Sequence, residues 1–283
     1  MDTYILSQEE LRTIQLIQLE MLEEVDRICR KYDIRYNIIA GTLLGAVRHK
    51  GYIPWDDDAD VALLRAEYDK FRRVCEKELD KDRFYFQDHR NTPGYRWGYG
   101  KLRRKNTLFI RENQEHMTYE QGIFIDIFPL DKVPNSKSLR RINNFHCFCI
   151  RKCMWAPIGV KAANRFLSKV TYKLLLKIPE KLLYNHYEKY ILKQQKIDSD
   201  WVRILTFPTP NNEYGYKRQW YEESTEIEFE KKLFYGIKEW DEYLSFKFGE
   251  YQKLPEEKDR KIHPITALKL LSNNDVTQKD MVK

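Results

Sequence analysis

The chain has 283 residues, of which 33% are charged and 42% hydrophobic, a balance typical of a soluble globular protein with a core of ordinary size. No apolar run approaches the ~20 residues that a membrane helix needs. The acidic opening MDTYILSQEEL differs from a signal peptide, so we expect a cytoplasmic protein whose five cysteines are reduced.

The net charge of +7 is concentrated in one stretch of the chain. Residues 132–179 contain eleven Lys or Arg and no Asp or Glu, and apolar side chains are interleaved with them. Such a stretch suits an anionic partner such as phospholipid headgroups, a phosphorylated glycan or nucleic acid. We expect peripheral contact with the inner face of the membrane and no nucleic-acid partner. The alternative is a solvated helical face.

The first elements follow from hydrophobic periodicity. Ser7 and Glu10 form a capping-box pattern, and apolar residues then recur at helical spacing, which predicts a helix over 8–32. RYNIIAG predicts a short strand, and TLLGAVRH predicts a short helix that Thr42 would cap with its hydroxyl. After a loop, DADVALL predicts a buried strand and RAEYDKFRRVCEKEL an amphipathic helix.

The remaining segments predict an α/β (α+β) fold with a mixed sheet. RFYFQDH, YGKLRRKNTLFI and GIFIDIFPLD are typical of strands, and WDEYLSFKFGEY of a helix. We expect residues 1–135 to form a catalytic core and residues 136–271 a helical, basic and aromatic-rich part that completes the site. No Gly/Ser-rich linker separates them, which predicts a shared interface, and residues 272–283 are expected to be a disordered tail.

Four aspartates, Asp56, Asp57, Asp58 and Asp60, precede the buried strand. In an extended chain Asp56, Asp58 and Asp60 would point one way and Asp57 the other. Neighbours on one face are about 6.6 Å apart and repel by roughly 2.5 kcal/mol at an effective dielectric of about 20. A divalent cation, Mg²⁺ or Mn²⁺, is the expected counter-charge, and it would also bind phosphate.

Other interpretations of the aspartates fit less well. An exposed acidic loop is disfavoured because the apolar residues 61–64 attach the cluster to a buried strand. An EF-hand would need glycine where Val61 stands. GTLLGAVR lacks the Gly-Lys-Ser/Thr ending of a phosphate-binding P-loop.

Gly41-Thr42 at a strand-to-helix turn, followed by Asp58-Ala59-Asp60-Val61, resembles the arrangement of the nucleotidyltransferase superfamily. GTLLGAVRHKGYIPWDDDADV resembles the LicD family in particular, which is related to the fukutin proteins and known for phosphocholine transferases of bacterial surface glycans. GIFIDIFPLD resembles that family's second block, and FGEYQKLPEEKDRKIHP its C-terminal signature. The chain has Phe229-Glu230-Lys231-Lys232 where FEGK is usual.

The resemblance implies a catalytic metal site and a phosphate site. Asp58 and Asp60 would be metal ligands, with Asp126 as a third ligand and as a candidate to accept the acceptor's proton. A second set of residues is expected to contact phosphate: Gly41, Thr42, Arg48, Lys50, Lys101 and Arg103. For some of them the alternative is a structural or solvent-exposed role.

The implied reaction moves a phospho-alcohol, with phosphocholine as first choice, from a CDP-linked donor to a hydroxyl of a cell-surface glycan or lipid-linked glycan. Teichoic acid, lipopolysaccharide and capsule precursors are the candidate acceptors. A choline group would need aromatic faces. The candidates for such a box, which could equally be core residues, are Trp201, Trp220, Tyr221, Trp240 and Tyr243.

Three alternatives stay open at this point. A nucleotide-sugar glycosyltransferase also uses Asp-x-Asp with a metal, but it would need a longer sheet before the motif. A non-catalytic module could bind membrane or nucleic acid through the basic stretch. HCFCIRKC invites a zinc site, but Cys149 and Cys153 share a helical face that Cys147 does not, so packed thiols are expected.

Overall fold

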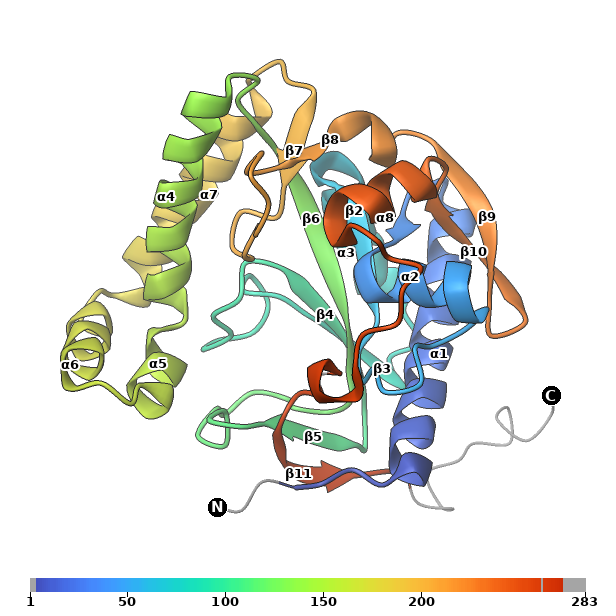
Figure 1. The fold of residues 1–283 in the computed structure, drawn as a ribbon. Helices are drawn as coiled ribbons and strands as arrows, with labels where there is room; N and C mark the ends of the chain where they lie inside the picture. The colour runs from blue at the N-terminus through green and yellow to red at the C-terminus, as the bar shows by residue number, and fades with distance from the viewer. Residues whose placement is uncertain (1–3, 261, 272–283) are drawn as a thin grey trace.

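The structure is a computed structural model that describes residues 4–260 and 262–271, so the tail predicted for 272–283 lies outside the described residues. A mixed sheet occupies its centre (Figure 1), with strand order β3-β4-β6-β2-β1-β10-β9, and β7 and β8 continue it from the far end of β6. The strands are β1 Asn37–Ile38, β2 Asp60–Leu64, β3 Phe84–Gln87, β4 Gly100–Arg104, β6 Phe124–Val133, β7 Trp201–Arg203, β8 Tyr216–Lys217, β9 Ser224–Phe229 and β10 Lys232–Ile237. This mixed architecture confirms the predicted fold class.

Two pairs of strands in the central sheet are parallel, β2 with β6 and β1 with β10, and its other pairs are antiparallel. A separate two-stranded sheet joins β5 (Leu108–Arg111) to β11 (Ile265–Lys269). The C-terminal part of the chain therefore pairs with strands of the predicted core at three places, beside β6, beside β1 and beside β5.

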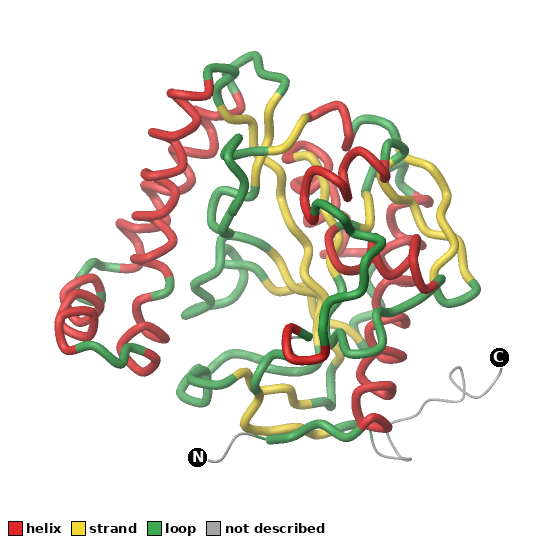
Figure 2. Tube along the Cα trace, in the orientation of Figure 1, coloured by secondary structure: helices red, strands yellow, loops and turns green. Residues whose placement is uncertain are grey.

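The helices divide into two groups (Figure 2). Four surround the sheet: α1 Gln8–Lys31, α2 Ala40–His49, α3 Arg65–Glu78 and α8 Trp240–Phe248. Four others extend to one side of it, and we call them the helical arm: α4 Lys137–Met154, α5 Ala156–Ala162, α6 Phe166–Leu175 and α7 Glu180–Gln195. Short 3₁₀ helices cover Arg218–Tyr221 and Glu257–Asp259. None of the helices in the described ranges combines the length and apolar character needed to cross a bilayer.

The first helix forms as its sequence predicts. The Ser7 hydroxyl accepts a hydrogen bond from the Glu10 amide at 3.2 Å, and the Glu10 carboxylate accepts one from the Ser7 amide at 2.8 Å. This capping box supplies partners for amides that the first turn leaves free. One face of α1, with Ile14 and Leu22 among others, is buried in the main core.

Two hydrophobic cores hold the molecule together. The main core lies on the sheet, whereas the second joins the helical arm to the end of β6. The second core contains Val133, Cys147, Ile150, Met154, Leu183, Tyr187, Ile191 and Leu205. A buried ion pair lies where α3 meets β6: Arg65 Nε and Nη2 donate to the two Asp131 carboxylate oxygens at 2.7 and 2.6 Å.

The sheet does not stop at residue 135. Strands β7 to β10 lie in the part expected to be helical, and Ile38 of β1 pairs with Gly236 of β10. Strands β7 and β8 have only three and two residues, too few for a periodic pattern. Strand β9 does alternate at Glu226, Ile227, Glu228 and Phe229, and this strand signal was overlooked. The helical character expected for 136–271 is found mainly in the helical arm, residues 137–195, and in α8, which the segment WDEYLSFKFGEY predicted.

Candidate active site

Three predicted carboxylates meet in one pocket of about 290 Å³. Asp60 at the start of β2 lies opposite Asp126 of the parallel strand β6, and Asp58 lines the same pocket from the preceding loop. On the other side of β6, Lys101 of β4 lies opposite Asp126. The pairing register thus places two carboxylates and an ammonium group side by side across three adjacent strands.

The side chains of the loop that contains Asp56, Asp57 and Asp58 point in different directions. Asp57 is fully buried and turns to Arg111, whose Nη1 donates to its carboxylate at 2.8 Å. Asp56 lies beside α2, where a Cβ on Gly41 would come within 2.7 Å of the Asp56 Oδ2 atom. Glycine at position 41 therefore leaves the space that the Asp56 carboxylate occupies.

Burial and mutual repulsion raise the pKa values of these aspartates. Burial, followed by the charges of Asp58 and Asp57, raises the pKa of Asp56 to about 8. The same two causes, burial and then the charge of Asp57, raise the pKa of Asp58 to about 6. The pKa of Asp60 lies well above its ordinary value because of burial and the charges of Asp58 and Asp126. The cluster therefore has more negative charge than its protein neighbours neutralise.

Lys101 is the basic residue that contacts Asp126. Its ammonium group bonds the Asp126 carboxylate and lies 3.4 Å from the centre of the Phe124 ring. Burial, opposed by the charge of Asp126, lowers the pKa of Lys101 to about 8. Arg103 is also buried at the pocket, where its Nε donates to Gln87 at 2.6 Å.

Thr42 has a different role from the expected helix cap. Helix α2 begins at Ala40 and lacks a side-chain cap, whereas the Thr42 hydroxyl accepts a hydrogen bond from the Asp60 amide at 2.8 Å. The prediction of a Thr42 cap was wrong because the helix starts two residues earlier. This hydrogen bond instead joins α2 to the start of β2 at Asp60, whose side chain is one of the site carboxylates.

Arg48 and Lys50 do not line the pocket. Arg48 donates to the Tyr251 carbonyl at 2.8 Å, so it anchors the segment after α8. Lys50 ends α2 in a left-handed conformation with φ of 58°, and its carbonyl accepts the Glu230 amide at 2.8 Å. Both residues connect elements around the site, and the basic groups at the pocket are Lys101, Arg103 and Arg111.

The five aromatic residues expected to form a choline box are not brought together at the pocket. Trp220, Tyr221 and Tyr243 are buried in the main core, with the Trp220 and Tyr243 rings 5.6 Å apart. Trp240 packs against the same core, and Trp201 packs against the second one beneath Arg140. The aromatic side chains that do line the pocket are Trp97, Tyr99, Phe109, Phe124, Phe128 and Phe207.

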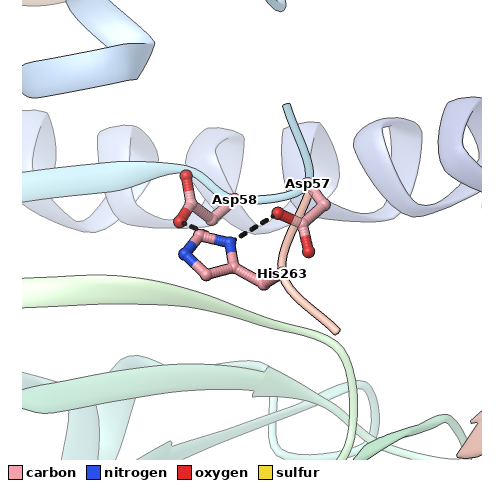
Figure 3. Close-up of side chains that lie close together, drawn as sticks. All are labelled: Asp57, Asp58 and His263. Carbon is pink, nitrogen blue, oxygen red and sulfur yellow. Dashed lines mark hydrogen bonds and ion pairs between the residues drawn. The ribbon is translucent and has the colours of Figure 1, made fainter. Parts of the chain in front are cut away.

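His263 is a site residue that sequence reasoning did not single out. Its Nδ1 lies 2.8 Å from Asp57 Oδ1 and 3.8 Å from Asp58 Oδ2 (Figure 3). The imidazole reaches the aspartates because β11 pairs with β5, which brings the segment before Ile265 to the pocket. Its signal was present in the sequence, since His263 belongs to the C-terminal signature FGEYQKLPEEKDRKIHP.

The cysteine-rich segment lies on α4 in the helical arm. Cys147 is buried in the second core, as expected of a packed thiol, and Cys149 and Cys153 are partly exposed. His146 faces His186 of α7, with their Nε2 atoms 2.8 Å apart. Within residues 4–260 and 262–271, one group of three potential ligands is close enough together to hold a metal ion. It consists of Asp57, Asp58 and His263, whose ligand atoms lie within 4.8 Å of one another.

The pocket carboxylates fit a divalent cation. Asp57 already has two basic partners, Arg111 and His263, so it has little need of another. Asp58 has a longer contact, 3.8 Å from its Oδ2 to His263 Nδ1. Burial and the charges of neighbouring aspartates raise the pKa values of Asp58 and Asp60 all the same. Carboxylate oxygens are the donors that Mg²⁺ and Mn²⁺ prefer. Asp58, Asp60 and Asp126 are therefore the residues best suited to hold such an ion.

A mixed sheet with carboxylates on two adjoining strands, next to a helix whose first turn contains Gly41 and Thr42, is the arrangement of a nucleotidyltransferase domain. Residues 33–157 match the LicD/FKTN/FKRP family, nucleotidyltransferase domain. The chain thus carries a LicD-family domain over these residues, as its motifs predicted.

Relatives among characterised and uncharacterised proteins agree with this assignment. The chain is 29% identical over 274 residues to the lipopolysaccharide cholinephosphotransferase LicD of Haemophilus influenzae, covering 92% of this chain and 98% of that protein. An uncharacterized protein of Rickettsia typhi is 38% identical over 65 residues, which are 23% of this chain and 20% of that protein. One of Rickettsia prowazekii is 42% identical over 48 residues, or 17% and 18% of the two chains. The similarity to the Haemophilus influenzae protein and the family match support the expectation of an enzyme, a transferase.

Proposed function

We propose that this protein transfers a phospho-alcohol, with phosphocholine as first choice, from a CDP-linked donor to a hydroxyl of a cell-surface glycan. The observation that carries the proposal is the convergence of Asp58, Asp60 and Asp126 with basic side chains in one pocket. The similarity to a lipopolysaccharide cholinephosphotransferase over 92% of the chain supports the same choice of reaction.

In this proposal Asp58, Asp60 and Asp126 hold Mg²⁺ or Mn²⁺. Such an ion would supply neutralising charge for the diphosphate of the donor and for the nucleoside monophosphate that leaves. Lys101 and Arg103 would bind phosphate oxygens from the opposite wall, because both present fixed positive charge inside a buried pocket. Asp126, kept close to the reacting groups by Lys101, would accept the proton of the acceptor hydroxyl.

The choline group would occupy the aromatic side of the same pocket rather than the box expected from the sequence. Tyr99 lies between Trp97 and Phe207, with ring centres 6.1 and 6.0 Å from its own. Aromatic faces attract a quaternary ammonium through their negative π-surface. The pocket would then bind the diphosphate at one end and the choline at the other.

A second pocket, of about 320 Å³, shares Trp97, Tyr99 and Phe207 with the first and continues to Arg151, Lys152 and Trp155 of the helical arm. We propose that the acceptor glycan binds here. Sugar rings bind to aromatic faces, and the two basic side chains would suit phosphate groups of a phosphorylated glycan or lipid-linked precursor. The acceptor hydroxyl would then approach the carboxylates past the shared aromatic residues.

A donor screen with purified protein tests this function. We expect CMP release in Mg²⁺ from one of CDP-choline, CDP-ethanolamine, CDP-glycerol or CDP-ribitol when a glycan acceptor is present. Asp58→Asn and Asp60→Asn should each reduce release by at least ~10²-fold, because each removes a charge that neutralises part of the bound cation. CMP release that is unaffected by both substitutions would contradict the proposal. Release of nucleotide from UDP-sugars alone would favour a glycosyltransferase instead.

A further inference from the structure

The tip of the helical arm exposes apolar side chains that a water-soluble surface does not usually gather. An amphipathic helix usually buries its apolar face, but α6 exposes it. The side chain that α6 buries is Tyr172, which ends in a hydroxyl group. Phe166 and Leu167 are 79% and 78% exposed, and Val170 and Leu174 continue the same face at helical spacing. Exposed apolar clusters of this kind mark interaction surfaces.

Basic residues surround this face and acidic ones do not. Residues 132–179 contain no Asp or Glu, so no carboxylate of α5 or α6 offsets the positive charge. Five basic side chains on and beside these helices are exposed: Lys161, Arg165, Lys169, Lys173 and Lys177. Lys169 and Lys173 lie one turn apart on α6, next to the apolar face.

The position of α6 leaves this face accessible. Helices α5 and α6 form the outer end of the arm, away from the central sheet (Figure 1). Gly159 of α5 allows α6 to approach closely, since a Cβ there would meet the Tyr172 ring at 2.6 Å. Tyr172 is thus fixed toward α5 and the arm, and the opposite face of α6 is left toward the solvent.

From this combination we infer that α6 is a membrane-docking helix that lies in the interface of an anionic phospholipid bilayer. An apolar face of one phenylalanine, two leucines and a valine, flanked by lysines, is the pattern of helices that insert shallowly between headgroups. The lysines supply attraction to anionic lipids, and the apolar side chains supply burial among the acyl chains. A second copy of this chain would present the same positive charge, so it is a poorer partner for this basic face than an anionic bilayer.

Docking through α6 would bring the second pocket to the membrane surface. The Trp155 ring in that pocket packs edge-on against Tyr172 of α6, with ring centres 5.4 Å apart. Lys152, which also lines the pocket, donates to the Tyr172 hydroxyl at 2.7 Å. A lipid-linked acceptor could therefore enter from the bilayer, although the docking inference itself does not depend on which reaction the pocket carries out.

Vesicle flotation of the full chain tests the inference. We expect binding to vesicles of phosphatidylcholine with about one-third phosphatidylglycerol, about tenfold weaker binding to pure phosphatidylcholine, and weaker binding at high salt. The double substitution Phe166→Ser/Leu167→Ser should weaken binding about tenfold or more, since both side chains lose their burial in the bilayer. Leu233→Ser, at a 53% exposed position on β10, is the matched control and should leave binding unchanged.

A second pair of variants separates charge from hydrophobicity. Lys169→Gln/Lys173→Gln should weaken binding to the anionic vesicles by about tenfold and remove much of its salt dependence. Lys77→Gln/Lys253→Gln changes two exposed lysines elsewhere and should have no effect. Equal flotation of the α6 variants and their controls would refute the inference. So would a stable dimer in light scattering that Phe166→Ser/Leu167→Ser converts to monomer, because α6 would then be a contact between copies.

Discussion

The hydrogen bond between the Thr42 hydroxyl and the Asp60 amide gives a direct test of how the site is held. Thr42 is 3% exposed, and its hydroxyl accepts the Asp60 N–H at 2.8 Å. Thr42→Val keeps the shape of the side chain but removes the acceptor, which leaves a donor unpaired in a buried position. The cost of such a group is about 1–3 kcal/mol. We expect the free energy of unfolding to fall by about that amount.

We also expect Thr42→Val to lower turnover by an amount of similar size in free energy. Asp60 is one of the proposed metal ligands, and a small shift of its backbone would misplace the carboxylate, for which losses on the order of 10²-fold are typical when a reacting group moves by about 1 Å. Thr42→Ser is the control, because it keeps the hydroxyl and removes only a methyl group. Urea unfolding and CMP release at saturating donor measure the two effects. If Thr42→Val is as stable and as active as Thr42→Ser, the hydrogen bond does not position the site.

Three further predictions concern pH, a buried charge and the metal. Burial opposes ionisation of Glu188, but hydrogen bonds from His89 and Arg90 outweigh it and lower its pKa from 4.5 to about 2. Glu188→Gln should therefore cost stability above about pH 4.5, and this cost should vanish as the pH falls toward 2 in acid-unfolding curves. Asp131→Ala should cost about 3–5 kcal/mol because it leaves Arg65 buried with only the more distant Asp69, at 3.8 Å, as a counter-charge, whereas Arg65→Leu/Asp131→Leu should recover most of the loss in urea unfolding. Removal of divalent metal with EDTA should abolish CMP release, Mg²⁺ or Mn²⁺ should restore it, and activity that survives exhaustive chelation would contradict the proposed metal site.

The sequence predicted best those features that depend on local pattern. The helix over residues 8–32 was correct within one residue because its capping box and its apolar spacing act within the helix itself. The strands that bear Asp60 and Asp126 were also found from their apolar runs. That Asp60 lies directly opposite Asp126 depends on how β2 and β6 pair, and these residues are 66 positions apart in the sequence. The hydrophobic pattern of each strand does not specify this pairing.

The features that escaped prediction depend on long-range contacts. Trp220 and Tyr243 are aromatic residues of the kind that form a ligand box, yet their rings pack against each other in the main core. Trp97 and Tyr99, from a loop, line the pocket instead. His263 reaches the aspartates only because β11 pairs with β5. Arg48 was expected at a phosphate, but the carbonyl of Tyr251 accepts its hydrogen bond.

The pairing of β1 with β10 limits how far the protein can be shortened. A recombinant fragment trimmed to the matched segment 33–157 would lose α1, β9, β10 and the strand that brings His263 into place. It would also leave β1 as a bare edge, and such an edge tends to recruit strands from other molecules. Attempts to isolate a minimal catalytic fragment should therefore yield aggregates, and the productive material for crystallisation would extend at least through β11.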